Sequence, residues 1–207
     1  MHADQYADTV PPGRLVRVST TPIAFLADWT KLWQLAQRLA STMGEEPGYV
    51  FMPVGLCLED PTGARAWDYA TTPVNSTTFA STGGDGVHFS LLHTNDSNGS
   101  APVVMTVPMA FDSPNHIVGG DLREFLALGC QTGYFSLERL AYRWGRQETV
   151  TRLRNGLPPH DAEEAGLLRH LAKEFNLQPW RDVERRLDEL DAVHRPQLQL
   201  PHDPSAS

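Results

Sequence analysis

The sequence lacks the short motifs that mark the commonest catalytic and metal-binding sites. It contains no GxSxG nucleophile elbow, no GxxxxGK phosphate-binding loop and no HExxH zinc pair. Its eight histidines are scattered, and the nearest useful pair, His88 and His93, is divided between an expected strand and the loop after it. We therefore interpret the chain as a non-enzyme that has no catalytic residue, no metal ligand and no cofactor.

Cysteine and long apolar runs are also scarce. The two cysteines, Cys57 and Cys130, have no CxxC or Cys–His ligand spacing, which is typical of free thiols in a reducing compartment. Residues 1–14 are polar and contain no apolar segment of a signal peptide. No apolar run approaches the roughly 18 residues that a membrane helix needs. These absences predict a cytoplasmic protein without membrane contact.

Cationic side chains are fewer than anionic ones, with 17 Lys and Arg against 25 Asp and Glu and a formal net charge of −8. This balance argues against direct binding to nucleic acid or to anionic membranes, and it suits a basic protein partner. Many acidic proteins have no such partner, so the charge alone selects no function. The 207 residues are enough for one sizeable core and few for two.

Residues 1–20 read as an extended leader that prolines interrupt. Thr21 followed by Pro22 predicts a helix start, because a hydroxyl can cap a helix and proline suits its first turn. Gly44 predicts the end of this helix. The apolar residues between them are spaced by three or four positions, as on one helical face: Phe25, Trp29, Leu32, Ala36 and Leu39.

Short apolar runs follow the expected helix. Residues 49–52 and 54–58, which Pro53 separates, are rich in aromatic and β-branched side chains and predict strand-like core. Residues 64–70 predict another strand. The sequence Asp60-Pro61-Thr62-Gly63 between them has the composition of a type I turn.

The middle of the chain carries the clearest strand pattern. Residues 77–80 lead into a glycine-rich turn at 81–86, residues 87–92 alternate in polarity, and residues 102–107 form another apolar run. Three strands joined by turns predict the middle of a mostly antiparallel sheet. The alternation assigns two faces to the second strand: Val87, Phe89 and Leu91 on one, and His88, Ser90 and Leu92 on the other.

Beyond Pro114 the sequence reads as helical. Residues 195–207 predict a disordered tail. A helix, then strands, then helices is the α+β arrangement, and we expect one domain at residues 21–194, in which an N-terminal helix and several C-terminal helices pack on the sheet. The expected helices start at Asp121, Ser136, Asp161 and Pro179. Asp161 and Glu164 have the spacing of a capping box. In the helix from Ser136, these apolar residues share one face: Leu137, Leu140, Ala141 and Trp144.

The glycine-rich turn allows two interpretations. Backbone amides in a glycine loop can hold a phosphate when the loop opens a helix. Here the loop precedes a strand and contains Asp85, which would repel phosphate. The preferred interpretation is a hairpin turn, because glycine supplies positive φ angles and Asp85 tolerates them.

The tripeptide Trp67-Asp68-Tyr69 also allows two interpretations. Two large rings around a carboxylate are a composition favoured at protein interfaces. Alternatively, the segment is a strand with Trp67 and Tyr69 in the core and Asp68 outside. The second interpretation is the commoner one for such a pattern.

The segment 77–90, with the sequence TTFASTGGDGVHFS, resembles the glycine-containing signature of the SUKH superfamily, which includes fungal cell-wall-assembly regulators and many bacterial immunity proteins. Residues 102–104 and 122–126 hold the places of the strand and helix that follow in the family pattern, and residues 67–69 fit ahead of the turn. The resemblance covers residues 22–130. It implies a non-catalytic α+β module that binds another protein, in bacteria often a toxin domain such as a basic nuclease.

Three functions follow as hypotheses. The first is a SUKH-type protein that binds and neutralises or regulates a partner, with these candidate contact residues: Trp67, Asp68, Tyr69, Asp85 and His88. The second is a small-molecule-binding protein or enzyme with a pocket between the sheet and the C-terminal helices. The third is a structural subunit that oligomerises through those helices.

Overall fold

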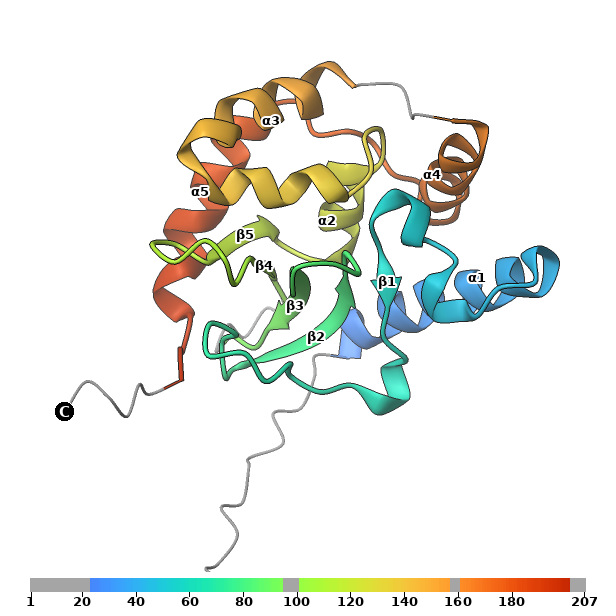
Figure 1. Ribbon diagram of the computed structural model, residues 1–207, viewed down its shortest axis with the longest axis horizontal. Coiled ribbons are helices and arrows are strands. Elements are labelled where there is room, and N and C mark those ends of the chain that lie inside the picture. Colours follow the sequence, from blue (N-terminus) through green and yellow to red (C-terminus); the bar gives the residue numbers. More distant parts are fainter. Residues whose placement is uncertain (1–22, 95–100, 157–160, 202–207) are drawn as a thin grey trace, which may run out of the picture.

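The computed structural model describes three stretches of the chain: residues 23–94, 101–156 and 161–201 (Figure 1). In them, one long helix precedes a five-stranded antiparallel sheet and several helices follow it, so the predicted α+β class is confirmed. The predicted leader and helix start, residues 1–22, lie outside the described residues. None of the described helices combines the length and apolar character needed to cross a membrane.

The first helix, α1 (Ile23–Met43), buries the side chains of Trp29, Leu32 and Ala36 completely. Their spacing puts them on one stripe of the helix, as predicted, and that stripe faces the core. The helix ends before Gly44, whose φ of 76° is left-handed and which therefore suits a helix end.

The strands predicted at residues 49–52 and 54–58 are largely wrong. Proline stands in the first turn of each 3-10 helix that replaces them, where its fixed φ and missing N–H suit a helical turn. Val50, Phe51 and Leu56 are buried nonetheless. The apolar pattern therefore indicated core residues correctly, although these residues do not form a strand. The segment consists of two 3-10 helices and one short strand: η1 (Pro47–Tyr49), η2 (Met52–Val54) and β1 (Cys57–Leu58).

The predicted turn after β1 is confirmed as part of a third 3-10 helix, η3 (Pro61–Gly63). The carboxylate of Asp60 accepts a hydrogen bond from the N–H of Thr62 at 2.8 Å. The N–H of Gly63 donates to the carbonyl of Asp60 at 3.0 Å, which closes the turn.

Residues 64–73, which we call the strap, do not form the predicted strand. Only Arg65 makes an isolated antiparallel bridge, to Thr78. The N–H of Trp67 then donates to the hydroxyl of Thr78 at 3.2 Å instead of to a backbone carbonyl. The strap therefore leaves the sheet edge after one bridge.

The sheet has the strand order β1-β2-β3-β4-β5 with every neighbouring pair antiparallel. Four strands follow β1: β2 (Ser76–Ser81), β3 (His88–Leu92), β4 (Val103–Thr106) and β5 (Asn115–Gly119). The first three match predicted strands. The last corrects the prediction of helices beyond Pro114: Ile117 pairs with Val104, and this short stretch has too little alternation to be recognised alone.

Four α-helices follow β5 in the described chain: α2 (Leu122–Gly129), α3 (Arg143–Asn155), α4 (Ala162–Phe175) and α5 (Val183–His194). Asp121 and Asp161 cap α2 and α4 as predicted, each accepting a bond from the N–H three residues later. The last helix starts at Val183 with Asp182 as its cap, later than the predicted start at Pro179.

The helix predicted from Ser136 through Trp144 is divided. Residues Phe135–Ala141 form the 3-10 helix η4, and the backbone at Tyr142 is extended, with φ −109° and ψ 131°. Leu137 and Leu140 are buried as predicted, whereas Trp144 is 70% exposed in the first turn of α3. Because of this break, Trp144 does not share a face with Leu137 and Leu140, contrary to what its spacing predicts.

The two faces of the sheet have different surroundings. One face packs with α1 and α2 into the main core, with strand side chains that include Phe89, Leu91 and Met105. The other face packs against α5, which lies beside β5 in Figure 1, with Leu92, Val104 and Ile117. His88 shares this second face, as the alternation predicts, and the strap covers it there.

The chain after α5 corrects the tail predicted from residue 195. It first forms η5 (Arg195–Gln197). The N–H of Val74 then donates to the carbonyl of Gln199 at 2.7 Å, and the N–H of Gln199 donates to the side chain of Asn75 at 3.0 Å. The tail is thus bound to Val74 and Asn75, directly after the strap, and residues 202–207 lie outside the described chain.

Candidate functional site

The strap places two aromatic rings against the polar end of the sheet. Trp67 and Tyr69 are two positions apart, so in an extended segment their side chains point the same way. Their ring centroids lie 6.1 Å apart. The imidazole of His88 lies 5.1 Å from the Trp67 ring and 5.6 Å from the Tyr69 ring. We call these three residues the aromatic triad.

His88 is fully buried at the start of β3, and two hydrogen bonds orient its ring. Nδ1 lies 2.7 Å from the carbonyl oxygen of Gly86, and Nε2 lies 3.0 Å from the hydroxyl of Thr72. A carbonyl oxygen only accepts, so Nδ1 carries the proton and Nε2 accepts from Thr72. Burial lowers the pKa of His88, and the bond to Gly86 opposes that shift only in part.

We expect the protein to lose stability as the pH falls. The neutral form of His88 is favoured in the folded state, whereas the unfolded chain takes up a proton near the ordinary pKa of about 6.5. Lowering the pH from about 7.5 to about 5.5 therefore decreases the free energy of unfolding. Burial also lowers the pKa values of His93 and His116, which adds to the same trend.

The pH dependence can be measured by urea unfolding at a series of pH values. His88→Gln keeps a donor and an acceptor but cannot take up the proton, so we expect a smaller pH dependence than in the unchanged chain. The matched control is His170→Gln, because His170 is exposed on α4. A pH dependence that His88→Gln leaves unchanged would contradict this assignment.

The turn before His88 is the predicted hairpin turn. Gly83, Asp85 and Gly86 have φ values of 81°, 51° and 69°, all left-handed. Glycine adopts this region without strain, and aspartate tolerates it. A Cβ at Gly86 would lie 2.8 Å from the phenol oxygen of Tyr69, so the close approach of the triad to the turn also depends on glycine.

Two adjoining hollows meet at Trp67. One, of about 210 Å³, lies between Trp67, Tyr69 and the turn. The other, of about 480 Å³, extends from Trp67 to Trp33 and Tyr49. Trp67, Ser81 and Gly83 line both, so the hollows form one continuous depression, which we call the Trp67 groove.

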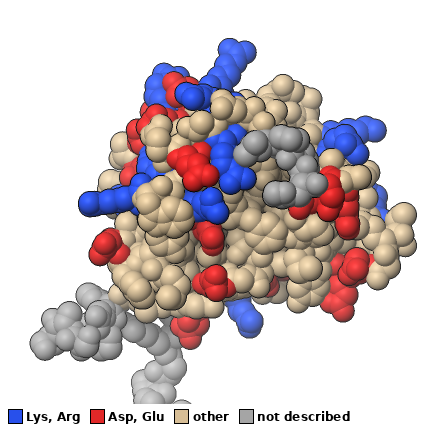
Figure 2. Space-filling model, turned by 45° about the horizontal axis from the view of Figure 1, so that its top comes forward, with Lys and Arg blue, Asp and Glu red and all other residues tan. Residues whose placement is uncertain are grey.

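The Trp67 groove is acidic. Glu46 and Glu59 line one part and Asp85 lines the other, and the described residues of its lining include neither lysine nor arginine. Burial raises the pKa of Glu138, the negative charge of Asp85 raises it further and Arg139 opposes the shift, so Glu138 stands near the turn without lining the groove. On the face drawn in Figure 2, acidic and basic groups both border a broad region without charged side chains.

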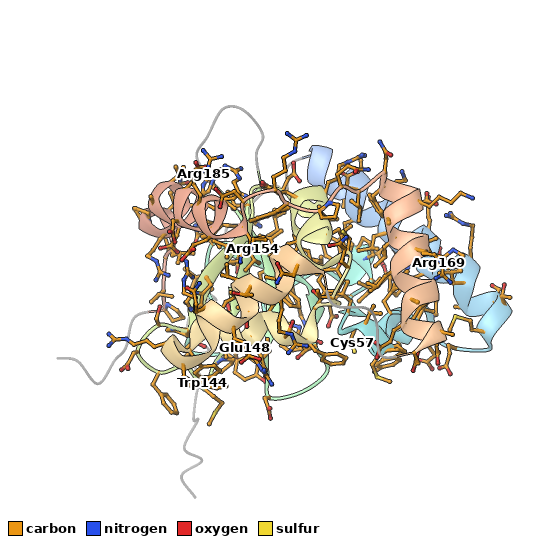
Figure 3. The ribbon with its side chains drawn as sticks, turned by 90° about the horizontal axis from the view of Figure 1, so that it is seen from above. Cys57, Trp144, Glu148, Arg154, Arg169 and Arg185 are labelled. Atoms are coloured by element: carbon orange, nitrogen blue, oxygen red, sulfur yellow. The ribbon has the colours of Figure 1, made fainter. Side chains whose placement is uncertain are left out.

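A thiol lies in the groove but is not suited to nucleophilic chemistry. Cys57, labelled in Figure 3, is buried, and both its burial and the charge of Glu59 raise its pKa. Because the thiolate is the reactive form, a raised pKa lowers the reactivity of the group. The described residues also contain no group of three or more His, Cys, Asp or Glu that could hold a metal ion.

The structure brings together four of the five predicted contact residues. Trp67, Tyr69 and His88 form the triad, and Trp67, Tyr69 and Asp85 line the Trp67 groove, whereas His88 is fully buried beneath the two rings and does not line it. Asp68 is exposed and is not part of the groove lining. Trp67 is half-buried and Tyr69 is 40% exposed, so neither ring is a fully buried core residue as the alternative interpretation required.

Sequence reasoning missed the other half of the groove. Trp33 follows Trp29 by four positions and extends the predicted face of α1, but spacing does not reveal that it is only partly buried. Tyr49 was expected in a strand and is instead 52% exposed at the end of η1. An aromatic residue next to a Pro-Gly pair was the available signal for an exposed turn.

A separate cavity of about 380 Å³ is lined by residues of β5, η4, α3 and α5. This is the region where the small-molecule hypothesis expects a pocket. None of the predicted candidates Asp68, Asp85 and His88 lines it.

Comparison of the chain with protein-family models, with curated proteins and with solved structures gives no match.

Proposed function

We propose that this chain is a non-catalytic protein-binding module of the SUKH type, and that its Trp67 groove receives a basic segment of a protein partner such as a toxin nuclease. The observation that carries this proposal is the groove itself, where exposed and half-buried aromatic rings stand among carboxylates without a cation in the lining. Large rings supply much of the binding energy at interfaces, and charge complementarity selects the partner and speeds association.

The order of the elements supports the proposal. The segments that resemble the SUKH pattern form β2, β3, β4 and α2 in that order, with β5 between the last two. They share one core, in which the ring of Phe125 on α2 lies 5.6 Å from Phe79 on β2 and 4.8 Å from Phe89 on β3. The residues behind the resemblance thus belong to one packed unit.

The state of the two cysteines indicates the cellular compartment of the proposed function. Cys57 and Cys130 are both buried and unpaired with each other. Free thiols persist in reducing surroundings, so we place the proposed function in the cytoplasm.

Binding of the partner to a Trp67→Ala variant tests the role of the groove. We expect the dissociation constant to rise by about 10- to 100-fold, the usual range for a central aromatic contact. Trp144→Ala is the matched control, because Trp144 is 70% exposed and does not line the groove. Equal weakening by both substitutions would count against the groove as the contact surface.

The charge of the groove can be tested with the same assay. Glu46→Lys should weaken binding and flatten its salt dependence, because the attraction between a basic segment and the groove is screened by salt. Glu163→Lys, which changes an exposed carboxylate on α4, makes the same charge reversal away from the groove. An affinity that Glu46→Lys does not lower more than Glu163→Lys does would contradict a basic partner segment.

A further inference from the structure

The cavity between β5 and the C-terminal helices has a lining unlike that of the Trp67 groove, with which it shares no residue. Three arginines contribute to it: Arg143, Arg146 and Arg195. Apolar side chains form another part of its lining: Ile117, Leu140 and Leu187. A pocket with convergent cations and an apolar wall is suited to a small amphiphilic ligand.

Carboxylates hold two of the arginines in place. Nη2 of Arg146 donates to Oδ1 of Asp188 at 2.6 Å, and Nε of Arg195 donates to Oδ2 of Asp191 at 2.7 Å. Nη2 of Arg195 also donates to the backbone carbonyl of Asn115 at 3.1 Å. These bonds orient both guanidinium groups, and each pair is neutral overall.

Arg143 is the cation that remains. Its side chain is exposed and has no hydrogen-bond or ion-pair partner among the described residues. It is the first residue of α3, where Tyr142 provides no side-chain cap and the first turn contains no acidic residue. A helix start already carries partial positive charge, which favours an anion and disfavours another cation. The unbalanced charge therefore lies at the cavity.

His116 reports on the charge of the same cavity. Its Nε2 lies 2.8 Å from the carbonyl oxygen of Ser113, so Nε2 carries a proton and Nδ1 is the site that can gain one. Burial lowers the pKa of His116, and the positive charges of Arg195 and Arg146 contribute to the lowering, whereas Asp191 and the Ser113 bond oppose it. An anion in the cavity would favour the protonated ring.

We propose that this cavity binds a small organic anion, with an oxyanion head against Arg143 and Arg146 and an apolar body on the wall around Ile117. The planar fork of a guanidinium group matches the oxygens of a phosphate or a carboxylate. The volume of about 380 Å³ is at the small end for ligand pockets and suits a body of one ring. The site is independent of the proposed protein-binding function.

Calorimetric titration of the full chain with phenyl phosphate tests the proposal at fixed ionic strength. We expect saturable binding that Arg143→Gln weakens roughly tenfold or more, since a charge-assisted hydrogen bond is lost. Arg169→Gln removes an exposed arginine from α4, far from α3 in Figure 3, and should leave the affinity unchanged. Equal weakening by the two variants would overturn the proposal.

Two further probes distinguish the parts of the ligand. Benzoate tests a carboxylate head, and saturable binding of neither benzoate nor phenyl phosphate would overturn the proposal. Inorganic phosphate should bind more weakly than phenyl phosphate, and equal binding would overturn the apolar part. In histidine side-chain NMR spectra, phenyl phosphate should move the His116 resonances and leave those of exposed His170 in place. The opposite pattern would show that the ligand binds elsewhere.

Discussion

Phe125→Ala will lower the free energy of unfolding by about 3–5 kcal/mol, the range for deleting a fully buried aromatic side chain. The Phe125 ring is completely buried on α2. It lies 4.8 Å from the ring of Phe89, 5.6 Å from Phe79 and 5.2 Å from Tyr134. Alanine would leave a cavity where α2 meets two strands. Urea unfolding followed by circular dichroism measures the loss.

Phe135→Ala is the matched control for that substitution. Phe135 stands at the start of η4 and is 49% exposed, so we expect a loss of less than about 1 kcal/mol. A loss from Phe125→Ala no larger than that from Phe135→Ala would mean that the main core does not lie between α2 and the sheet. Because a domain of this kind is stable by only about 5–15 kcal/mol in total, the expected difference is easily resolved.

Gly86→Ala will weaken both the fold and the binding of a partner. Alanine at a φ of 69° is disfavoured by roughly 1–2 kcal/mol. Its Cβ would also lie 2.8 Å from the phenol oxygen of Tyr69, which is at the free end of a partly exposed side chain and can swing away. We therefore expect a moderate loss of stability and at least a tenfold loss of affinity, because about 1.4 kcal/mol of lost contact corresponds to that factor.

Gly84→Ala is the control for Gly86→Ala, because it changes a glycine of the same turn without strain at φ and without contact with Tyr69. No atom lies within 4 Å of a Cβ at Gly84, and its φ is outside the left-handed region. We expect this variant to keep the stability of the unchanged chain, and the two variants are compared on stability because Gly84 also lines the groove. If Gly84→Ala and Gly86→Ala have equal effects, the close approach of Tyr69 to the turn is not what supports the groove.

The elements that could be predicted are those set by local chemistry. Asp121 and Asp161 cap helices because their carboxylates reach N–H groups three residues away, and this spacing is visible in the sequence. Likewise, the glycines and Asp85 mark the hairpin turn, since left-handed φ angles require such residues. The alternation of residues 87–92 likewise assigned both faces of β3, because successive side chains of a strand point to opposite faces.

The elements that could not be predicted depend on distant partners. β5 is a strand because its backbone pairs with the free edge of β4, and its five residues carry little strand pattern of their own. The strap is held by the Thr78 hydroxyl and by contact with His88, neither of which follows from its own sequence. Tyr49 and Trp67 line the groove from different elements, so the spacing of residues along the chain does not predict the groove.

The most direct test of the protein-binding claim is quantitative co-purification of the full chain from its own cells. We predict that a basic protein is recovered in near-equal amount with the unchanged chain and with Trp144→Ala, and that it is lost from Trp67→Ala. Recovery of no protein partner, or of one that Trp67→Ala retains in full, would contradict the assignment of the Trp67 groove as a protein-binding site.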